Sequence, residues 1–230
     1  MPQARVGAAD RVTVIGLGRF GTSVARTLHE LGYDVTAIDL DERRVQEASD
    51  FVTLAAQGDG ADEETLRSLD VDASDVGIVA QGESLESSLT STLVLKRLGV
   101  KLVVAKALTE LQGELLRRVG ADRIIYPERD AGVRLAHSLA VPHINDYIPL
   151  TATGGVAKLA APGFFAGQTL AELYGKHEAN LTVLLIRRGD AIIAAPPDTE
   201  RIEAGDELVV AGSDQAIEGF ADVKSKKAEK

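Results

Sequence analysis

The stretch VTVIGLGRFG, residues 12–21, decides the fold of the first half of the chain. Its β-branched residues VTVI predict a buried strand, and GLGRFG (Gly16–Gly21) follows at once as a G-x-G-x-x-G motif. In such a motif Gly16 permits the tight turn, Gly18 lets the backbone approach a phosphate, and Gly21 lets the following helix pack on the sheet. The helix N-terminus adds free N–H groups and a partial positive charge of about +0.5. This stretch therefore predicts a strand, a phosphate-binding loop and a helix.

Outward from this motif, short apolar runs alternate with amphipathic segments from Arg11 to about Ala140. The expected strands are Val12–Gly16, Asp34–Asp39, Phe51–Asp59, Asp75–Gly82, Lys101–Ala107 and Arg123–Pro127. The expected helices lie near Arg19–Leu31, Asp41–Ala48, Asp62–Leu69, Leu85–Leu98, Glu110–Val119 and Glu128–Leu139. Runs of Val, Ile and Leu are typical of parallel strands covered on both faces. The pattern predicts an α/β fold with a Rossmann-like, doubly wound parallel sheet.

The pattern changes after about Ala140, where VPHINDYIPL (residues 141–150) resembles a linker. Short β-rich segments follow, and RGD (Arg188–Asp190) between two apolar runs predicts a hairpin turn. Short helices are expected near Gln168–Leu173 and Asp214–Phe220. We therefore expect a nucleotide-binding domain at 10–140, a small α+β domain at 141–223 and a solvated tail at 224–230.

Composition excludes several classes of function. The 230 residues include 25 Lys+Arg and 35 Asp+Glu, a formal charge of −10, which disfavours binding to nucleic acid. Cysteine is absent, so disulfides, thiolate catalysis and Cys-ligated metal sites are excluded. No apolar run is long enough to span a bilayer, and the first residues lack the apolar core of a signal peptide. We expect a soluble protein that reaches a membrane only by docking on a partner.

Three polar residues follow predicted strands and are candidates for holding a nucleotide. Asp39 ends the second strand, about 20 residues beyond the glycine loop, where a carboxylate binds ribose hydroxyls and repels a 2′-phosphate. The alternative role for Asp39 is a helix N-cap. Asp59 follows the third strand on the adenine side, with a turn residue as the alternative. Gln81 follows the fourth strand and is expected to line the crevice with its backbone.

Arg19 stands inside the glycine loop, where a guanidinium could neutralise a terminal phosphoryl group. Such a residue favours a nucleoside diphosphate or triphosphate such as ADP or ATP over a dinucleotide, or a site that accepts both. The alternative is a solvent-facing arginine on the first helical turn, which would oppose the helix dipole. Phe20, its neighbour in the loop, completes the candidate binding residues.

Several motifs together resemble the regulator of K⁺ conductance (RCK) family, whose Ktr and Trk members are cytosolic subunits of bacterial potassium uptake systems. In the first half these are GLGRFG, the AID strand end (37–39), GDGADEETL (58–66) and ADRIIYPERDAGVRLA (121–136). In the second half they are GQTLAEL (167–173) and PPDTERIEAGDELVVAGSDQAIEGF (196–220). The resemblance extends from about Arg11 to Val223, and one TrkA-N-like with one TrkA-C-like domain resembles the Ktr type.

The resemblance implies a regulatory subunit that binds ATP or ADP and forms dimers within an octameric ring. The ring would lie on the cytoplasmic face of the cell membrane, beneath a membrane K⁺ channel or transporter subunit (KtrB-like). It further implies that Arg19 contacts the terminal phosphate, that Asp39 holds the ribose, and that Glu128 contributes to a site for a monovalent or divalent cation. Some members bind cyclic di-AMP at the C-terminal domain. The residues alone give Glu128 a simpler role, since Pro127 and Glu128 favour a helix start.

Two other functions remain open: an NAD(H)-binding, redox-sensing regulator and an NAD-dependent dehydrogenase. Asp39 permits NAD, and only Arg19 argues against it. A dehydrogenase needs an acid–base group near the nicotinamide. None of the histidines is paired with a nearby carboxylate in a catalytic motif, so we expect no enzyme activity. The histidines are His29, His137, His143 and His177.

Overall fold

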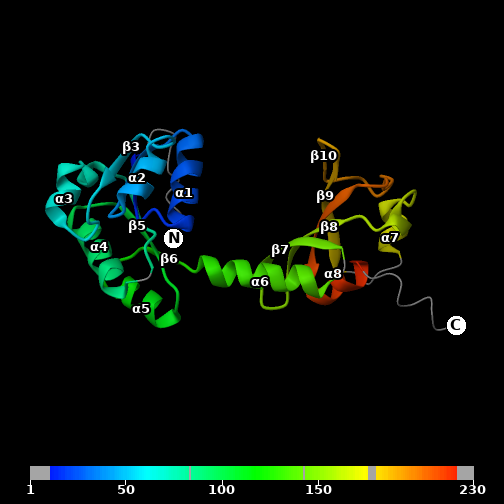
Figure 1. The fold of residues 1–230 in the computed structure, drawn as a ribbon. Helices are drawn as coiled ribbons and strands as arrows, with labels where there is room; N and C mark the ends of the chain where they lie inside the picture. Colours follow the sequence, from blue (N-terminus) through cyan, green and yellow to red (C-terminus); the bar gives the residue numbers. More distant parts are fainter. Residues whose placement is uncertain (1–10, 83, 142, 176–179, 222–230) are drawn as a thin grey trace. The chain divides into compact units, whose positions relative to one another are not determined.

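The computed structural model describes residues 11–82, 84–141, 143–175 and 180–221, and the chain divides into two compact units (Figure 1). Unit 1 comprises Met1–Arg129 and unit 2 comprises Asp130–Lys230. The expected tail at 224–230 and His177 lie outside the described residues. The domain boundaries at 10–140 and 141–223 stay a prediction, and helix α6 (Pro127–Ala140) runs across the division between the units.

Unit 1 is a six-stranded parallel sheet with the order β3-β2-β1-β4-β5-β6. Its strands are β1 (Arg11–Ile15), β2 (Asp34–Asp39), β3 (Leu54–Gln57), β4 (Val76–Val79), β5 (Leu102–Lys106) and β6 (Arg123–Ile125). Its helices are α1 (Arg19–Glu30), α2 (Glu42–Ala48), α3 (Glu63–Ser68), the 3₁₀ turn η1 (Val71–Ala73), α4 (Leu85–Arg97) and α5 (Glu110–Arg118). The predicted Rossmann-like fold class is confirmed.

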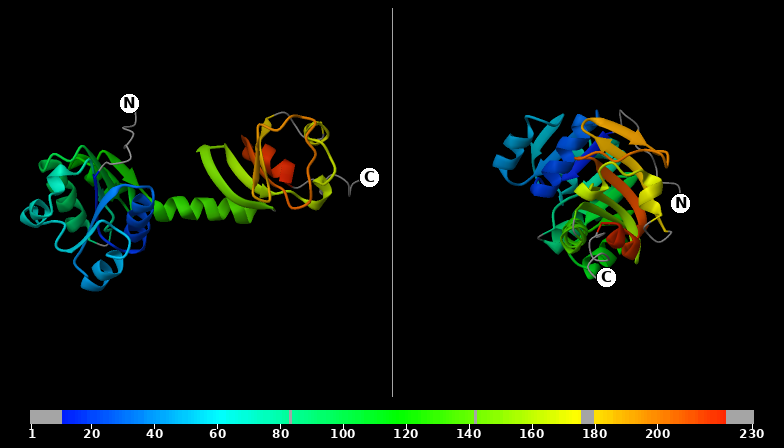
Figure 2. Two further views of the ribbon diagram at one scale, coloured as in Figure 1. Left: turned by 90° about the horizontal axis from the view of Figure 1, so that it is seen from above. Right: turned by 90° about the vertical axis from the view of Figure 1, so that its right-hand side faces the viewer.

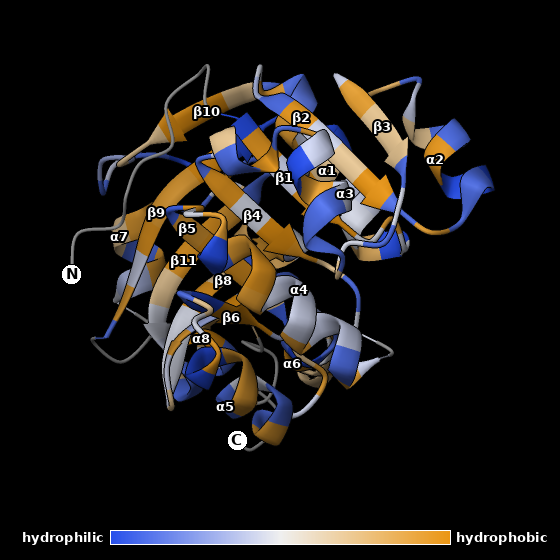
Figure 3. Cartoon of the chain, turned by 90° about the vertical axis from the view of Figure 1, so that its left-hand side faces the viewer, coloured by the Kyte–Doolittle hydropathy of each residue, from blue (hydrophilic) through white to orange (hydrophobic). Residues whose placement is uncertain are grey.

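The sheet of unit 1 is covered by helices on both faces. Successive side chains of a strand point to opposite sides, so each strand contributes to two apolar clusters. Val14 packs in one apolar cluster with Ala25 of α1 and Ala48 of α2. Ile15, the next residue, packs in a second cluster with Leu95 of α4 and Leu116 of α5. Figure 3 shows the same arrangement as apolar strands, coloured orange, between helices of mixed hydropathy.

The order of the strands reverses direction at β1, which pairs with β2 on one side and with β4 on the other. In parallel α/β sheets the crevice for ligands lies at the carboxyl ends of the strands at such a switch point. Here Ile15 is paired with Ile38 of β2 and with Val79 of β4, so the carboxyl ends of the three strands lie together. The glycine loop leaves β1 at this edge.

Unit 2 holds a five-stranded antiparallel sheet with the order β10-β9-β11-β8-β7. Its strands are β7 (Ile144–Thr151), β8 (Gly154–Ala160), β9 (Leu181–Arg188), β10 (Ala191–Ala194) and β11 (Glu207–Ser213). Its helices are η2 (Gly163–Phe165), α7 (Leu170–Tyr174) and α8 (Asp214–Ala221). Figure 2 shows α8, in red, against the strands, and its Phe220 is fully buried in the core of this unit. The predicted small α+β fold is confirmed.

The structure corrects one expectation for unit 2 and confirms another. The stretch 141–150 is no linker, since Ile144–Thr151 forms the edge strand β7 and buries Ile144 and Tyr147. Pro149 fits this strand because proline is tolerated on an edge strand, where one N–H needs no partner. The hairpin at Arg188–Asp190 is confirmed, because β9 and β10 pair across it and Gly189 has φ +58°.

One ion-pair cluster ties a long loop of unit 2 to its sheet. Asp206 is 1% exposed, and both its carboxylate oxygens accept hydrogen bonds from the Arg188 guanidinium at 2.9 and 3.0 Å. Arg188 also contacts Glu200 and Glu203 and donates to the Arg201 carbonyl. Burial raises the pKa of Asp206, but the bonds from Arg188 and the Glu203 N–H outweigh it and hold the pKa below its usual value. The Ala195–Asp206 segment is thereby held on β9.

Candidate functional site

The glycine loop of unit 1 is packed too tightly for side chains at two of its three glycines. Gly16 has φ +96°, and a Cβ there would lie 2.8 Å from the Gln81 backbone nitrogen. A Cβ on Gly21 would lie 1.9 Å from the Gly16 carbonyl oxygen. Gly16 also donates its N–H to the Ile38 carbonyl at 2.8 Å. Glycine is therefore needed at 16 for the turn and at 21 for the close approach of α1 to the loop.

Gly18 differs from these two because its surroundings are open. It is the N-cap residue of α1, and nothing lies within 4 Å of the place where its Cβ would stand. Within the described chain no side chain caps this helix, and its first turn holds no acidic residue. The end of α1 thus presents unshielded backbone N–H groups and the positive end of the helix dipole, which fits a phosphate group.

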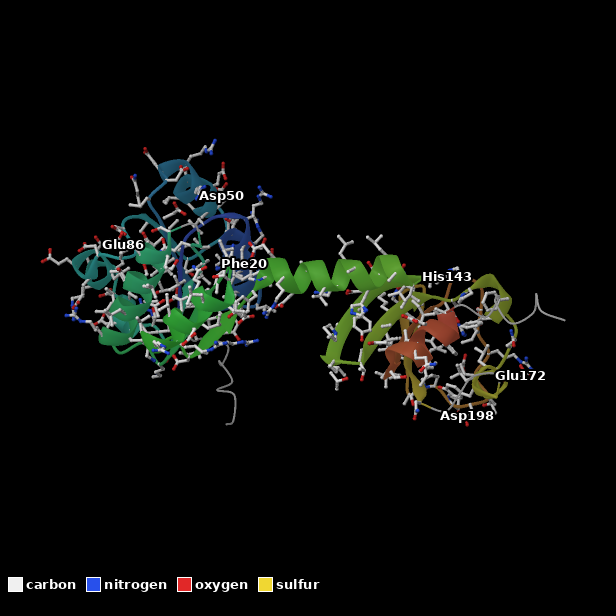
Figure 4. All side chains as sticks on the ribbon, turned by 90° about the horizontal axis from the view of Figure 1, so that it is seen from below. Phe20, Asp50, Glu86, His143, Glu172 and Asp198 are labelled. Carbon is white, nitrogen blue, oxygen red and sulfur yellow. The ribbon has the colours of Figure 1, made fainter. Side chains whose placement is uncertain are left out.

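The two side chains next to Gly18 lie in different surroundings. Arg19 is the first residue of α1 and is exposed, and its guanidinium has no hydrogen-bond or ion-pair partner among the described residues. Phe20, labelled in Figure 4, is half-buried and packs on the apolar cluster that contains Val14 and Ala25. Arg19 is thus available to an anion at the loop, whereas Phe20 anchors α1. Their roles in binding stay predictions.

Asp39 is largely buried at the end of β2 and is hydrogen-bonded to the glycine loop. Its Oδ2 accepts the Leu17 N–H at 2.6 Å, and its Oδ1 accepts the Asp41 N–H at 2.9 Å. Arg44 Nη1 lies 3.5 Å from the same Oδ2. The N-cap of α2 is Asp41, so Asp39 does not have the N-cap role considered as its alternative. The ribose role of Asp39 stays a prediction, and part of its capacity to accept hydrogen bonds is already used.

Asp59 and Gln81 both have structural contacts at this edge. Asp59 is exposed and its Oδ1 accepts the Ala61 N–H at 2.9 Å, which is the turn contact expected of the alternative role. Gln81 donates from Nε2 to Ser91 Oγ of α4 at 2.7 Å. Its backbone lines the glycine loop, as the Gly16 geometry above shows. Contacts of either residue with adenine or phosphate stay predictions.

Glu128 forms an ion pair with a residue that the sequence reasoning missed. Lys106, the last residue of β5, places Nζ 2.6 Å from Glu128 Oε1, and its side chain is only 13% exposed. The hydrogen bond from Lys106 holds the pKa of Glu128 below its usual value. No cluster of three or more potential metal ligands occurs among the described residues. The cation role of Glu128 stays a prediction that needs ligands from elsewhere.

Lys106 could have been noticed from the sequence. It is a lysine at the end of the apolar run KLVVAKA, and the carboxyl end of a parallel strand is where ligand-binding side chains of such sheets stand. The spacing of Lys106 and Glu128 gave no sign that the two would meet, because their contact depends on the pairing of β5 with β6.

Comparison with protein families gives two matches along the chain. The TrkA-N domain model matches residues 12–127, and the TrkA-C domain model matches residues 157–224. The first match contains the glycine loop, Asp39 and Lys106, and the second contains Arg188 and Asp206.

Among curated proteins the chain is similar to two potassium uptake proteins over most of its length. It is 38% identical to the Ktr system potassium uptake protein C of Bacillus subtilis, covering 90% of this chain and 94% of the relative. It is 37% identical to the Ktr system potassium uptake protein A of Vibrio alginolyticus, covering 86% and 90%. Among the described residues, no helix is both long and apolar enough to cross a bilayer.

Among solved structures the chain resembles the GsuK RCK domain, with a TM-score of 0.64 at 18% identity. It also resembles a GsuK channel bound to NAD, with a TM-score of 0.61 at 17% identity. Each match covers 96% of this chain, but only 49% and 40% of the other chain, so this chain spans half or less of their length. At this identity the likeness shows the fold.

Proposed function

The chain belongs to the RCK family of TrkA-N and TrkA-C domain proteins, with relatives of the Ktr type, and from that premise we propose that it is a nucleotide-responsive regulatory subunit of a potassium uptake system. ATP and ADP are the proposed ligands. The subunit does not convert them chemically. It responds because the two nucleotides bind its conformations with different free energies, and only such a difference shifts a conformational equilibrium.

The observation that carries this proposal is the open end of α1. Gly18 leaves space for a phosphate, the first helical turn is uncapped, and the exposed Arg19 guanidinium stands beside it. The nucleotide would be held by the loop amides and by Asp39 at its ribose, with Arg19 at the terminal phosphate. A guanidinium at the positive end of a helix dipole is unfavourable by itself, and a bound polyphosphate removes that conflict.

We further propose that copies of the chain assemble, as dimers within an octameric ring, on the cytoplasmic face of a KtrB-like membrane subunit. Helix α6 supports self-association, because none of its described side chains is buried although it carries apolar residues. Leu135 and Leu139 are 59% and 77% exposed in the single chain. A cation at Glu128 and cyclic di-AMP at unit 2 stay predictions that follow from the family alone.

Calorimetric titration of the full chain with ATP, ADP, NAD⁺ and NADH tests the proposal. We expect ATP and ADP to bind, and Arg19→Ala to reduce the preference for ATP over ADP by about ten-fold, the effect of losing one charge-assisted contact. Arg26→Ala is the matched control, because Arg26 lies two turns further along α1 and stacks on Phe51. Equal loss of both nucleotides in Arg19→Ala would contradict the role of Arg19.

A second candidate is an NAD(H)-binding regulator, which the Asp39 carboxylate at the end of β2 favours. The GsuK channel of similar fold is described as bound to NAD. Binding of NADH in the same titration, with no signal for ATP or ADP at millimolar concentration, would establish this candidate and exclude the first.

A further inference from the structure

Helix α4 is held on unit 1 in two different ways along its length. Its C-terminal half is held by apolar packing, because Val94 and Leu95 are buried in the core of this unit. Gly77 of β4 lets this half lie close to the sheet, since a Cβ there would be 2.7 Å from Leu95 Cδ1. The N-terminal half, residues 85–92, has one partly buried leucine, Leu89, and otherwise buries hydroxyl groups. These hydroxyl groups belong to Ser88, Ser91 and Thr92, each 0% exposed.

Two of these hydroxyl groups bind Gln81, which follows β4 at the ligand edge of the sheet. Gln81 donates from Nε2 to Ser91 Oγ at 2.7 Å. Its carbonyl oxygen accepts from Ser88 Oγ at 3.1 Å, and the same hydroxyl lies 2.9 Å from the Ser84 carbonyl oxygen. Thr92 differs, because its hydroxyl donates within the helix, to the Ser88 carbonyl at 2.7 Å. Both the side chain and the backbone of Gln81 are thus bound to the N-terminal half of α4.

The other side of segment 80–81 lies against the glycine loop. Ala80 donates its N–H to the Ile15 carbonyl at 2.8 Å. The Gln81 nitrogen lies 2.8 Å from the position of a Cβ on Gly16, and Ala80 Cβ lies 3.0 Å from the position of a Cβ on Gly21. Both tightly packed glycines of the loop therefore have this segment as a neighbour. Because packed groups do not deform freely, a shift of the loop also shifts the segment.

The two halves of α4 differ in how easily they open. Opening the C-terminal half exposes buried apolar side chains, which is costly. Opening the N-terminal half mainly exchanges hydrogen bonds within the protein for hydrogen bonds with water, and each such bond contributes little net free energy. Segments with few buried apolar contacts open locally, without unfolding of the whole unit. A ligand that fixes the glycine loop also fixes segment 80–81, and so keeps Gln81 in place for α4.

We infer that the N-terminal half of α4 is ordered when the glycine loop is occupied, and that Gln81 and Ser91 are the positioning residues that connect the two. This inference rests on the proposed nucleotide site and adds a consequence of its occupancy. Segment 85–92 opens in the empty subunit and closes in the loaded one. The nucleotide state of the loop is thereby transmitted to a helix whose residues 85–92 need not touch the ligand.

The experiment is amide hydrogen exchange of the full chain with and without ATP, at an ATP concentration that calorimetry shows to saturate each variant. Dilute denaturant leaves local opening unchanged and speeds exchange that needs global unfolding, so it identifies the local openings of 85–92. We expect ATP to slow local exchange of 85–92 in wild-type protein by about five-fold or more, the size of one net hydrogen bond.

Ser91→Ala removes the acceptor of the Gln81 amide and should separate the helix from the loop. We expect faster exchange of 85–92 in the empty variant, by about five-fold, and an ATP-induced slowing below about two-fold. Gln81→Met removes the same bond from the strand side and should give the same result. Thr92→Val is the matched control, because it removes a buried hydroxyl of the same helix that does not bind Gln81. It should keep the full ATP-induced slowing.

Three outcomes would overturn the inference while the nucleotide site stands. In the first, ATP binds wild-type protein without slowing the exchange of 85–92. In the second, Ser91→Ala and Gln81→Met keep the slowing seen in wild type. In the third, Thr92→Val loses the slowing as fully as Ser91→Ala, which would show that only the stability of the helix matters. If wild-type protein binds neither ATP nor ADP in the calorimeter, the proposed function fails and this inference fails with it.

Discussion

At the edge of unit 1, helix α1 begins without a side-chain cap and the described chain offers Arg19 no partner, whereas in unit 2 the Arg188 guanidinium contacts three carboxylates. The same type of side chain is thus left open in one unit and fully engaged in the other. Donors that the protein leaves exposed and unshielded are free to bind an anion in place of water. A saturated cluster has no such donors and fixes the conformation of a loop.

The two units therefore use their charged and polar groups differently. Unit 1 carries the features that favour a small anionic ligand, all at the carboxyl ends of its strands. In unit 2 the charged groups bind one another and stabilise the fold. Asp206 is only 1% exposed, and both its carboxylate oxygens accept hydrogen bonds from Arg188. Each of the following predictions changes one group in one unit and uses a matched group elsewhere as its control.

The largest effect is expected in unit 2, from Arg188→Met. The substitution leaves the buried Asp206 carboxylate without its partner, and breaking a buried ion pair from one side costs about 3–5 kcal/mol. Denaturant unfolding of the full chain, followed by hydrogen exchange of peptides from 181–221, measures the loss in unit 2. Peptides from unit 1 should keep their protection.

Arg118→Met is the control for this prediction. Arg118 pairs with Glu114 on the surface of α5, where both side chains are more than half exposed. Such a pair contributes about 0.5 kcal/mol or less. A loss of similar size in the two variants would show that burial of Asp206 contributes nothing, and that the contrast between the units is wrong.

The next effect concerns unit 1 and the glycine loop. Gly21→Ala would place a Cβ 1.9 Å from the Gly16 carbonyl oxygen, so α1 must move away from the loop. Overpacking against backbone costs about 3 kcal/mol, and the displaced helix end should no longer bind nucleotide. Thermal unfolding and calorimetric titration with ATP measure the two effects.

Gly18→Ala provides the matched control at the same motif. Nothing lies within 4 Å of the added Cβ, and φ at Gly18 is −67°, which any residue adopts. We expect stability within about 0.5 kcal/mol of wild type, together with weaker ATP binding because the methyl group occupies space left for phosphate. Unchanged ATP affinity in Gly18→Ala would place the ligand away from this glycine.

Much of unit 1 could be predicted from the sequence because its signals are local. The run VTVI, the glycines at 16 and 21 and the apolar strand ends each depend on a few adjacent residues. The linker assigned to 141–150 was wrong because β7 is an edge strand, whose pattern is set by pairing with β8 far along the chain. A strand with one partner tolerates Pro149 and exposed side chains, so its local pattern is weak.

The parts of the site that the sequence did not predict are tertiary contacts. The hydrogen bond from Leu17 to Asp39 spans 22 residues, and the Lys106–Glu128 pair also spans 22 residues, across the β5–β6 crossover. Sequence reasoning found that Asp39 and Glu128 stand at strand ends. It could not show that each already has a partner in the single chain, because that depends on strand order and register.

The smallest expected effect compares one buried tyrosine in each unit. Tyr147 of unit 2 donates its hydroxyl to Asp214, and burial followed by this carboxylate raises the pKa of Tyr147 to about 12. Tyr126 of unit 1 donates to Glu110 at 3.0 Å, and its pKa is raised by the same causes but lowered in part by Arg117 and Arg129. Unit 2 should therefore respond more strongly than unit 1 to alkaline pH.

The sign follows from the raised pKa of Tyr147. A group whose folded pKa lies above its unfolded value, about 10, stabilises fully below pH 10, and this contribution is lost as the pH rises through about 12. The loss should be at most about 2.7 kcal/mol, since the pKa rises by about two units and each unit corresponds to about 1.4 kcal/mol. Tyr147→Phe should cost about 1 kcal/mol at pH 7 and remove most of the loss between pH 10 and 12. Tyr126→Phe should leave the pH profile of unit 2 unchanged. If hydrogen exchange of unit 2 peptides keeps its alkaline profile in Tyr147→Phe, another group carries it, and the hydroxyl bond to Asp214 contributes nothing to closing unit 2.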